Sequence, residues 1–401
     1  MNKSTVGELI IDDESCQYGL GLPAEEYNPN KVRYLRISDL DDSGNLLDDD
    51  KKSISAPNIQ EYILKPNDLV VARTGNSTGR TYVYSEDDEK LAYAGFLIKY
   101  VFDSEKINPR YMKYFTISNI YKKQISGFSG STRGNMNAQN FKDITVIYPD
   151  RKIQDKMVEL FDLISKKIKN NNKIISELES MVKTIYDYWF LQFEFPNEDG
   201  KPYKSSGGKM VWNEELKREI PEGWEVFMVK DFCDIFTGKK DVNQALDTGK
   251  YKFFSCAPGY KYSNDKLYTG KAILISGNGS YTGRTIFVND SFDLYQRTYA
   301  CVMKPNYDNM LEYIFYTMKT FFVKRVSGGT HGSAIPYIVY NDIANEHFYY
   351  NKEVVDTFMK TIESIQEHII ELSKENQELA SLRDFLLPML MNGQVTFKED
   401  E

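Results

Sequence analysis

Two glycine-rich turns contain residue types that could bind phosphates or bases. The first is Arg73-Thr-Gly-Asn-Ser-Thr-Gly-Arg80, and the second is Ser276-Gly-Asn-Gly-Ser-Tyr-Thr-Gly-Arg284. Backbone amides of such a turn can hold a phosphate, but the chain has no Gly-Lys-Ser/Thr ending of a nucleotide-binding loop. The repetition favours a hairpin turn that the fold requires, with direct contact as the alternative. The candidate contact residues here are Arg73, Asn76, Ser77, Thr78, Arg80, Asn278, Tyr281 and Arg284.

A polar loop in each half of the chain offers further candidates. Residues 128–137 and 329–333 follow predicted helices that are rich in aromatic and basic side chains. Short polar side chains reach base edges and phosphates, although ordinary solvated loops have the same composition. The two loops differ in sequence, as two different half-sites would require. Their candidate residues are Ser129, Ser131, Thr132, Arg133, Asn135, Asn137, Thr330, His331, Ser333 and Tyr337.

The net charge of −8 counts against a nucleic-acid partner, because phosphate binding relies on Lys and Arg. The distribution of charge matters more than the total. Residues 105–142 contain seven Lys or Arg and a single acid, Glu105, whereas acidic runs such as residues 41–50 lie elsewhere. We therefore expect a basic face on an acidic protein, and an ordinary solvated surface is the alternative.

Catalytic and metal-binding motifs are missing from the sequence. It has no Asn/Asp-Pro-Pro-aromatic tetrapeptide of amino-methyltransferases, and its four cysteines and three histidines form no zinc pattern. We expect a chain without catalytic residues, bound metal or disulfides. The start lacks a basic segment followed by an apolar run, and no stretch of about 18 apolar residues occurs. We therefore expect a cytoplasmic protein without membrane contact.

The elements that position the turns and loops are short strands and two helices. The first half predicts a β-rich domain in which a helix over 108–125 precedes the polar loop. The second half repeats this order, with its helix over 309–326, and a connector rich in Gly, Pro and Ser joins the halves at 194–208. The predicted strands are 32–38, 62–64, 69–72, 81–84, 96–102, 144–148, 251–255, 272–276 and 285–288.

One long amphipathic helix ends each half. Apolar residues recur at steps of three and four over 153–190, and the same spacing returns 201 residues later over 354–390. At about 1.5 Å per residue each helix is about 55 to 60 Å long. Asn171 and Asn376 occupy apolar positions of the stripe, which favours a defined helix pair. Because the unit is duplicated, we predict that the pair is antiparallel.

The duplicated plan, the helix ending Leu386-Leu-Pro-Met-Leu-Met-Asn-Gly-Gln-Val395, and the connector Phe195-Pro-Asn-Glu-Asp-Gly-Lys-Pro-Tyr-Lys-Ser-Ser-Gly-Gly208 resemble the specificity subunit of type I restriction-modification systems. The turn after Leu69 also resembles one in the recognition domains of that family. The second copy departs from it, with Lys271 in place of Asp68 and Ile275 in place of Arg73.

This resemblance implies a non-catalytic reader of a bipartite site in double-stranded DNA. It implies assembly with two adenine-N6 methyltransferase subunits and two restriction/translocase subunits. S-adenosylmethionine, ATP and Mg²⁺ would belong to these partners, and this chain would bind no cofactor. The alternatives are the specificity chain of a related combined restriction-methylation enzyme and a coiled-coil scaffold without a DNA role.

The resulting fold class is α+β, with two β-rich target recognition domains of similar fold, each followed by a long helix. The helices pair as an antiparallel coiled coil in an internal duplication with pseudo-twofold symmetry. The predicted segments are recognition domain 1 at 1–150, the first spacer helix at 151–192, the connector at 193–222, recognition domain 2 at 223–350, and the second spacer helix and tail at 351–401.

Overall fold

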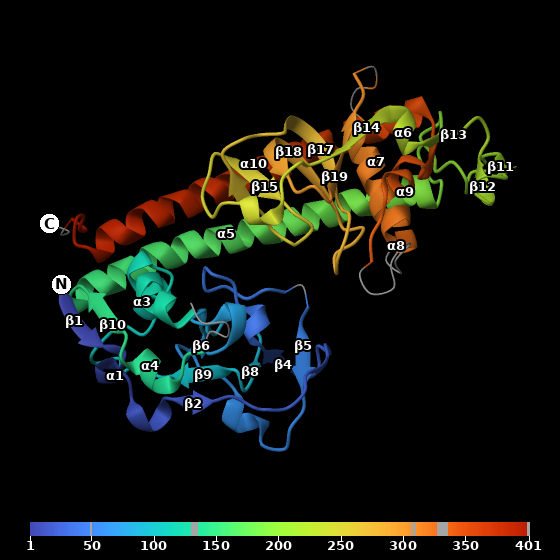
Figure 1. Ribbon diagram of the computed structural model, residues 1–401. Coiled ribbons are helices and arrows are strands. Elements are labelled where there is room, and N and C mark those ends of the chain that lie inside the picture. Colours follow the sequence, from blue (N-terminus) through green and yellow to red (C-terminus); the bar gives the residue numbers. More distant parts are fainter. Residues whose placement is uncertain (49, 130–134, 306, 308–309, 327–335, 399–401) are drawn as a thin grey trace. The chain divides into compact units, whose positions relative to one another are not determined.

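A computed structural model describes residues 1–48, 50–129, 135–305, 307, 310–326 and 336–398 (Figure 1). The chain forms two compact units. The first unit contains residues 1–172 and 373–401, and the second contains residues 173–372. Each unit therefore combines one β-rich domain with part of both long helices, so each unit is described separately below.

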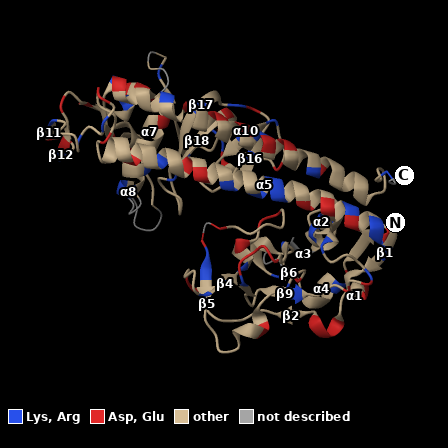
Figure 2. Cartoon of the chain, turned by 180° about the vertical axis from the view of Figure 1, so that it is seen from behind, with Lys and Arg blue, Asp and Glu red and all other residues tan. Residues whose placement is uncertain are grey.

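The two long helices are α5, Arg151–Tyr186, which continues as the π-helix η5, Asp187–Leu191, and α10, Lys352–Met391. Both carry acidic and basic residues along their length (Figure 2). In the first unit, the start of α5 shares a core with the end of α10, including Met157 and Leu387. In the second unit, the end of α5 packs with the start of α10, including Tyr186 and Phe358. The predicted antiparallel pairing is confirmed.

Polar residues interrupt the helix seam inside the first unit. The Asn171 side chain is 1% exposed, and its Nδ2 donates to Asn376 Oδ1 at 3.0 Å and to Glu375 Oε2 at 2.7 Å. Asn376 Nδ2 donates in turn to Asn172 Oδ1 at 2.8 Å. Only one register satisfies these donors and acceptors together, so the asparagines specify the alignment of the helices.

The first unit contains two four-stranded sheets and a two-stranded pair among its described residues, with strand orders β2-β9-β6-β7, β3-β5-β4-β8 and β1-β10. The strands are β1 Asn2–Thr5, β2 Gln17–Tyr18, β3 Glu25–Glu26, β4 Val32–Leu35, β5 Lys52–Ile54, β6 Leu69–Ala72, β7 Thr81–Val83, β8 Leu91–Tyr93, β9 Leu97–Tyr100 and β10 Thr145–Tyr148. The helices are α1 Val6–Leu9, η1 Asp12–Glu14, η2 Ile37–Asp39, η3 Ile59–Tyr62, η4 Gly75–Ser77, α2 Tyr111–Phe115, α3 Asn119–Ser129 and α4 Ala138–Lys142.

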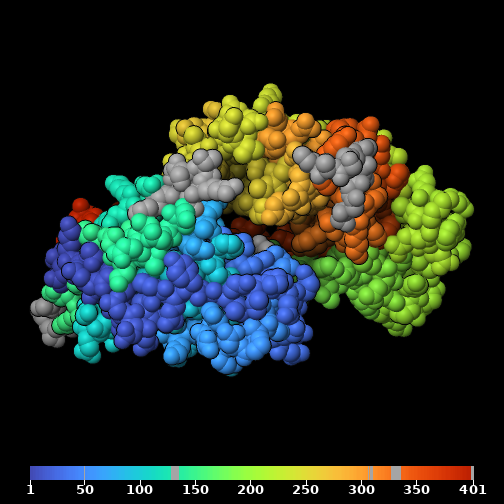
Figure 3. Space-filling model, turned by 60° about the horizontal axis from the view of Figure 1, so that its bottom comes forward, coloured from blue at the N-terminus to red at the C-terminus, as the bar shows by residue number. Residues whose placement is uncertain are grey.

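One apolar core of the first unit joins its sheet to helices α2 to α4. Val71, Ile98, Phe115, Tyr121 and Phe141 are buried together in this core. In the space-filling view, the blue surface of the N-terminal strands lies directly against the teal surface of the helical segment (Figure 3). The core therefore holds α3 in a fixed position behind the turn between β6 and β7.

The second unit contains a six-stranded sheet, ordered β14-β19-β17-β18-β15-β16, and the pairs β13-β20 and β11-β12 among its described residues. The strands are β11 Met210–Asn213, β12 Arg218–Pro221, β13 Glu225–Met228, β14 Cys233–Thr237, β15 Tyr251–Phe254, β16 Lys261–Ser263, β17 Tyr268–Ser276, β18 Thr285–Leu294, β19 Thr298–Met303 and β20 His347–Tyr350. The helices are α6 Val229–Phe232, η6 Val242–Gln244, α7 Leu311–Thr317, the π-helix η7 Met318–Phe322, α8 Val323–Val326 and α9 Tyr340–Ala344.

Two sequence predictions of local structure are wrong. The single helix expected over 108–125 is divided into α2 and α3, because Thr116 Oγ1 accepts from Thr81 Oγ1 and Ser118 Oγ accepts from the amide of Tyr121. A side chain that bonds to nearby backbone, as that of Ser118 does, competes with the helix. Residues 62–64 form no strand, and Ile63 makes only an isolated bridge to Ala92.

Candidate nucleic-acid interface

The first glycine-rich turn is a closed structure held by its own backbone. Gly79 N donates to Ala72 O at 2.8 Å, and Thr78 Oγ1 donates to Gly75 O at 2.7 Å. Gly79 has a φ of +85°, and a Cβ there would lie 2.6 Å from Ile125 Cδ1 of α3. Tyr121 of α3 donates to Gly79 O at 2.7 Å. Helix α3 therefore fixes the turn from behind.

The second turn repeats this arrangement with other side chains. Gly283 N donates to Ser276 O at 2.8 Å, and Thr282 Oγ1 donates to Gly279 O at 2.7 Å. Gly283 has a φ of +82°, and an added Cβ would lie 2.3 Å from Val326 Cγ2 of α8. The same bonds at equivalent positions show that the fold requires both turns.

Each turn is joined to the polar loop that follows it about 60 residues later. In the first unit, Thr74 bridges to Asn135, and Met136 N donates to Arg73 O at 2.8 Å. We call residues 72–80 with 135–136 the first junction. Sequence-predicted candidates that lie far apart in the chain are thus brought to one place.

The second unit has an equivalent junction, formed by residues 276–284 with 336–338. Asn278 bridges to Tyr337, and Ile338 N donates to Gly277 O at 2.9 Å. Thr282 Oγ1 also donates to Pro336 O at 2.9 Å. The turn candidates and Tyr337 therefore belong to one surface in the second unit.

The hydrogen bonds correct the alignment expected from the sequence. Met136 N bonds to Arg73 O, and Ile338 N bonds to Gly277 O, so Gly277 and not Ile275 stands at the position of Arg73. By the same register Ala272, and not Lys271, stands at the position of Asp68. The sequence alignment slipped because the two copies share few side chains on these strands.

Several candidates in the turns are engaged within the protein. Arg80 Nε donates to Asp42 Oδ1 at 2.7 Å, and its Nη1 donates to Leu40 O at 3.0 Å. Arg284 Nη1 donates to Ala257 O at 3.3 Å. Ser77 and Thr78 are both buried.

Other candidate residues are accessible to solvent or lie outside the described residues. Asn76 and Tyr281 are exposed, whereas Asn278 and Arg73 are half-buried. Asn137 caps α4 by accepting from the amide of Asn140, and Ser129 is the last residue of α3. Outside the described residues lie Ser131, Thr132, Arg133, Thr330, His331 and Ser333.

The basic segment 105–142 is less positive in the structure than in the sequence. Lys106 pairs with Asp103 at 3.6 Å, Lys113 with Asp162 at 3.7 Å, and Lys142 with Asp12 at 2.7 Å. Arg110 also pairs with Asp162. Lys122 and Lys123 on α3 remain exposed. Among the described residues of this segment, the positive charge without an ion pair therefore lies on α3, next to the first junction.

Three residues near the junctions escaped the sequence analysis. Tyr18 and Phe96 are exposed and lie beside Arg73, whose Cζ is 5.2 Å and 5.6 Å from their ring centroids. Arg297 occupies the position of Phe96 in the second unit, since its carbonyl accepts from Gly277 N as that of Phe96 accepts from Arg73 N. The sequence signal that could have identified Phe96 and Arg297 is a large residue in the short connection before β9 or β19.

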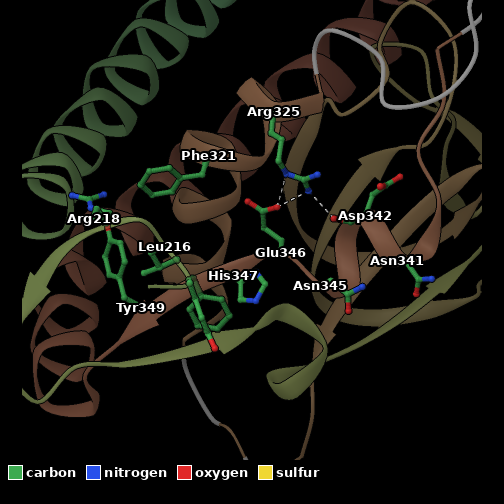
Figure 4. A pocket seen from close by; sticks show the side chains of 12 residues that line it. Leu216, Arg218, Phe321, Arg325, Asn341, Asp342, Asn345, Glu346, His347 and Tyr349 are labelled. Carbon is green, nitrogen blue, oxygen red and sulfur yellow. Dashed lines mark hydrogen bonds and ion pairs between the residues drawn. The ribbon is translucent and has the colours of Figure 1, made fainter. Parts of the chain in front are cut away.

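A pocket of about 450 Å³ in the second unit lies between the β11–β12 hairpin, α8, α9 and β20 (Figure 4). Two of its charged side chains, Arg325 and Glu346, form an ion pair. Arg325 Nε donates to Glu346 Oε2 at 2.9 Å, and Arg325 Nη2 donates to Asp342 O at 2.8 Å. Burial raises the pKa of Glu346, and the neighbouring Arg325 partly offsets this rise. The Arg325 guanidinium in this pocket is therefore already paired within the protein.

Nucleophilic and metal-binding groups are poorly placed for chemistry. Burial raises the pKa of the Cys233 thiol to about 12 and also raises that of Cys301, which disfavours the reactive thiolate. The described residues contain no group of three His, Cys, Asp or Glu side chains arranged to hold a metal. Within the same residues, no helix has the length and apolar character needed to cross a membrane.

The fold and the junctions define a class of internally duplicated proteins, with two β-rich domains and a pair of long antiparallel helices. The family model described as "Type I restriction modification DNA specificity domain" matches residues 19–180 and 221–374. The chain belongs to this family.

Three specificity subunits of type I restriction enzymes are similar to this chain. The chain is 25% identical over 298 residues to the type I restriction enzyme MjaIX specificity subunit of Methanocaldococcus jannaschii, covering 70% of this chain and 66% of that protein. It is 29% identical over 191 residues to the EcoDI specificity subunit of Escherichia coli, covering 44% and 40%. It is 21% identical to the HindI specificity subunit of Haemophilus influenzae, covering 84% and 89%.

A solved structure shares the fold. The crystal structure of the type I restriction-modification S subunit from M. genitalium aligns with a TM-score of 0.51 at 14% identity, covering all of this chain and 96% of that one. The predicted fold class is therefore confirmed over the whole chain.

Proposed function

We propose that this chain is the non-catalytic DNA-reading subunit of a type I restriction-modification enzyme. Each β-rich domain reads one half of a bipartite site in double-stranded DNA, and partner subunits methylate adenine and cut the DNA. The support comes from the family and from one structural observation. Both junctions have the same backbone framework but carry different side chains, as two readers of different half-sites require.

Partners and cofactors follow from this assignment. Two adenine-N6 methyltransferase subunits and two restriction/translocase subunits bind S-adenosylmethionine, ATP and Mg²⁺, and this chain binds none of them. Apolar side chains on the long helices support docking of a partner. Within the first unit, Leu163 is 61% exposed and Phe385 is 63% exposed, which is costly for a chain that works alone. Such an enzyme acts on cellular DNA, which places the chain in the cytoplasm.

Mapping of methylated adenine tests the two-reader model. The chain is produced with its methyltransferase subunit in a host without adenine methylation, and the genomic DNA is sequenced for modified bases. A bipartite methylated sequence is expected. Replacing residues 223–350 with the corresponding domain of a relative should change one half of that sequence and leave the other half unchanged. If the exchange alters both halves together, the two domains do not read independently.

A second experiment tests partner docking. Leu163→Ser and Phe385→Ser remove exposed apolar area, so they should weaken co-purification with the methyltransferase subunit while the isolated chain stays folded. Val242→Ser, at a 45% exposed position on η6, is the matched control and should leave co-purification unchanged. Equal losses for all three variants would argue against docking on the helices.

A further inference from the structure

Three side chains from separate segments meet beside the first junction. Tyr18 belongs to β2, Arg73 follows β6, and Phe96 precedes β9. Arg73 Cζ lies 5.2 Å from the centroid of the Tyr18 ring and 5.6 Å from that of Phe96. The amide of Arg73 also donates to Phe96 O at 3.0 Å, which fixes the two backbones side by side. We call these residues the Tyr18–Arg73–Phe96 cluster.

Both aromatic rings of the cluster are accessible to a ligand. Tyr18 is 45% exposed and Phe96 is 54% exposed, although both contact the guanidinium. The cation–aromatic contacts hold the three side chains together while leaving the rings and the guanidinium accessible to a ligand. The cluster therefore has the surface of a contact site.

Arg73 differs from the other arginine of its turn. Arg80 is paired with Asp42, whereas no carboxylate of the described residues lies within ion-pair distance of Arg73. The Nε of Arg73 is buried and has no hydrogen-bond partner among the described atoms. A cation without a counter-charge is suited to a ligand that brings acceptor atoms.

The second unit shows that the fold does not need this cluster. There Thr237, Gly277 and Arg297 stand at the positions of Tyr18, Arg73 and Phe96. No side chain fits at Gly277, because an added Cβ would lie 2.2 Å from Arg297 O. Structural features that the fold requires occur in both units, as the two glycine-rich turns do. The cluster is therefore specific to what the first domain binds.

We propose that Arg73, held by Tyr18 and Phe96, reads a guanine in the half-site of the first recognition domain. This inference rests on the proposed function and names one base that the first domain selects. The flat guanidinium presents parallel N–H groups that match O6 and N7 of guanine in the major groove. Contact with two rings limits the orientations of the guanidinium, so the donors are arranged before DNA arrives. Tyr18 and Phe96 are positioning residues, and Arg73 is the reading residue.

A pool of duplexes with randomised bases tests the proposal. The full chain with its methyltransferase subunit binds the pool, and the bound DNA is sequenced. The natural chain should enrich guanine at one position of one half-site. Arg73→Lys keeps the charge but loses the planar pair of donors, so preference for guanine at that position alone should fall by about 5-fold or more. Tyr18→Leu and Phe96→Leu should reduce the same preference by a smaller factor.

A matched control separates the cluster from a general loss of aromatic surface. Tyr27 is 39% exposed, and Lys51 Nζ lies 5.7 Å from its ring centroid, so it is another cation–aromatic contact in the same unit. Tyr27→Leu should leave the enriched sequence unchanged. Because Tyr18 and Phe96 lie on the surface, their leucine variants keep the core and remain informative if Arg73→Lys fails to fold.

The outcomes are distinct. An enriched bipartite site whose guanine preference survives Arg73→Lys overturns the proposal but leaves the DNA-reading function intact. If Arg73→Lys weakens binding evenly across sequences, Arg73 contacts a phosphate, and the proposal is overturned while the DNA-reading function stands. A first half-site without guanine also overturns it. If the natural complex enriches no sequence, the proposed function itself fails.

Discussion

The two β-rich domains use the same backbone to present different chemistry. The first junction contains Arg73, which follows β6, whereas Arg297, which precedes β19, lies beside the second junction. The backbone bonds that hold the two junctions are nevertheless equivalent, from Met136 to Arg73 and from Ile338 to Gly277. Main-chain contacts thus define the framework, and the side chains are free to differ. The long helices show a similar contrast, with an asparagine layer in the first unit and an aromatic cluster in the second.

We expect the largest loss of stability from a substitution in the aromatic cluster of the second unit. The Phe358 ring lies 5.1 Å from that of Phe190 and 6.0 Å from that of Trp189. Phe358→Ala should lower the free energy of unfolding of the second unit by about 3 to 5 kcal/mol. Urea unfolding followed by tryptophan fluorescence measures this, since all three tryptophans lie in that unit. A loss below about 1 kcal/mol would mean that the cluster does not hold the helices there.

The turn glycines test whether both frameworks are equally required. Gly79→Val and Gly283→Val each place a branched side chain at positive φ against a packed helix, so each should cost about 3 kcal/mol. Gly75→Ala is the control, because its φ is also positive but nothing lies within 4 Å of the added carbon. It should cost about 1 kcal/mol. Circular dichroism during urea unfolding measures the free energy of unfolding of all three variants. If only one of the two valine variants is destabilised, the two turns are not equally required.

The asparagine layer of the first unit should contribute less. Asn171→Ala removes donors to Asn376 and Glu375 at a buried position, and should cost about 1 to 2 kcal/mol in thermal unfolding. Asn172 is its exposed neighbour, so Asn172→Ala should change stability by less than about 0.5 kcal/mol. Equal costs would show that burial of the amide is not what matters.

The smallest expected effect depends on pH. Burial raises the pKa of Asp68 above its ordinary value of 3.8, so the folded state binds the proton more tightly than the unfolded state. Stability due to this group is therefore present at acidic pH and is lost as pH rises through the raised pKa. Asp68→Asn should increase stability at pH 7 by about 1 kcal/mol or less, and this difference should shrink on acidification. Destabilisation at pH 7 would mean that Lys99, 3.9 Å away, outweighs burial.

The long helices were predictable because a strong signal extends over many residues. The apolar repeat predicted both helices, and the duplication predicted their antiparallel pairing. Asn171 and Asn376 indicated where the two helices contact each other. Strands such as β2 and β8 are two or three residues long and have no periodicity to detect. The division of the predicted helix 108–125 depends on hydroxyl contacts of Thr116 and Ser118, which composition does not reveal.

The candidate site was predictable only in part. Both turns and the described ends of the polar loops were identified, but their junction is a long-range pairing that local sequence does not encode. Tyr18, Phe96 and Arg297 were missed because they lie outside the turns and polar loops, and a large residue before a strand is only a weak signal. Arg80 was overestimated, since its partner Asp42 lies 38 residues away in the chain.

The bonds that join each turn to its loop have an evolutionary consequence. Met136 N to Arg73 O and Ile338 N to Gly277 O connect main-chain atoms, which every residue type except proline can supply at the donor position. Mutations of the neighbouring side chains therefore leave the connection intact. Under the proposed function, point mutations at these junctions can therefore change the side chains offered to DNA while the main-chain connection is kept.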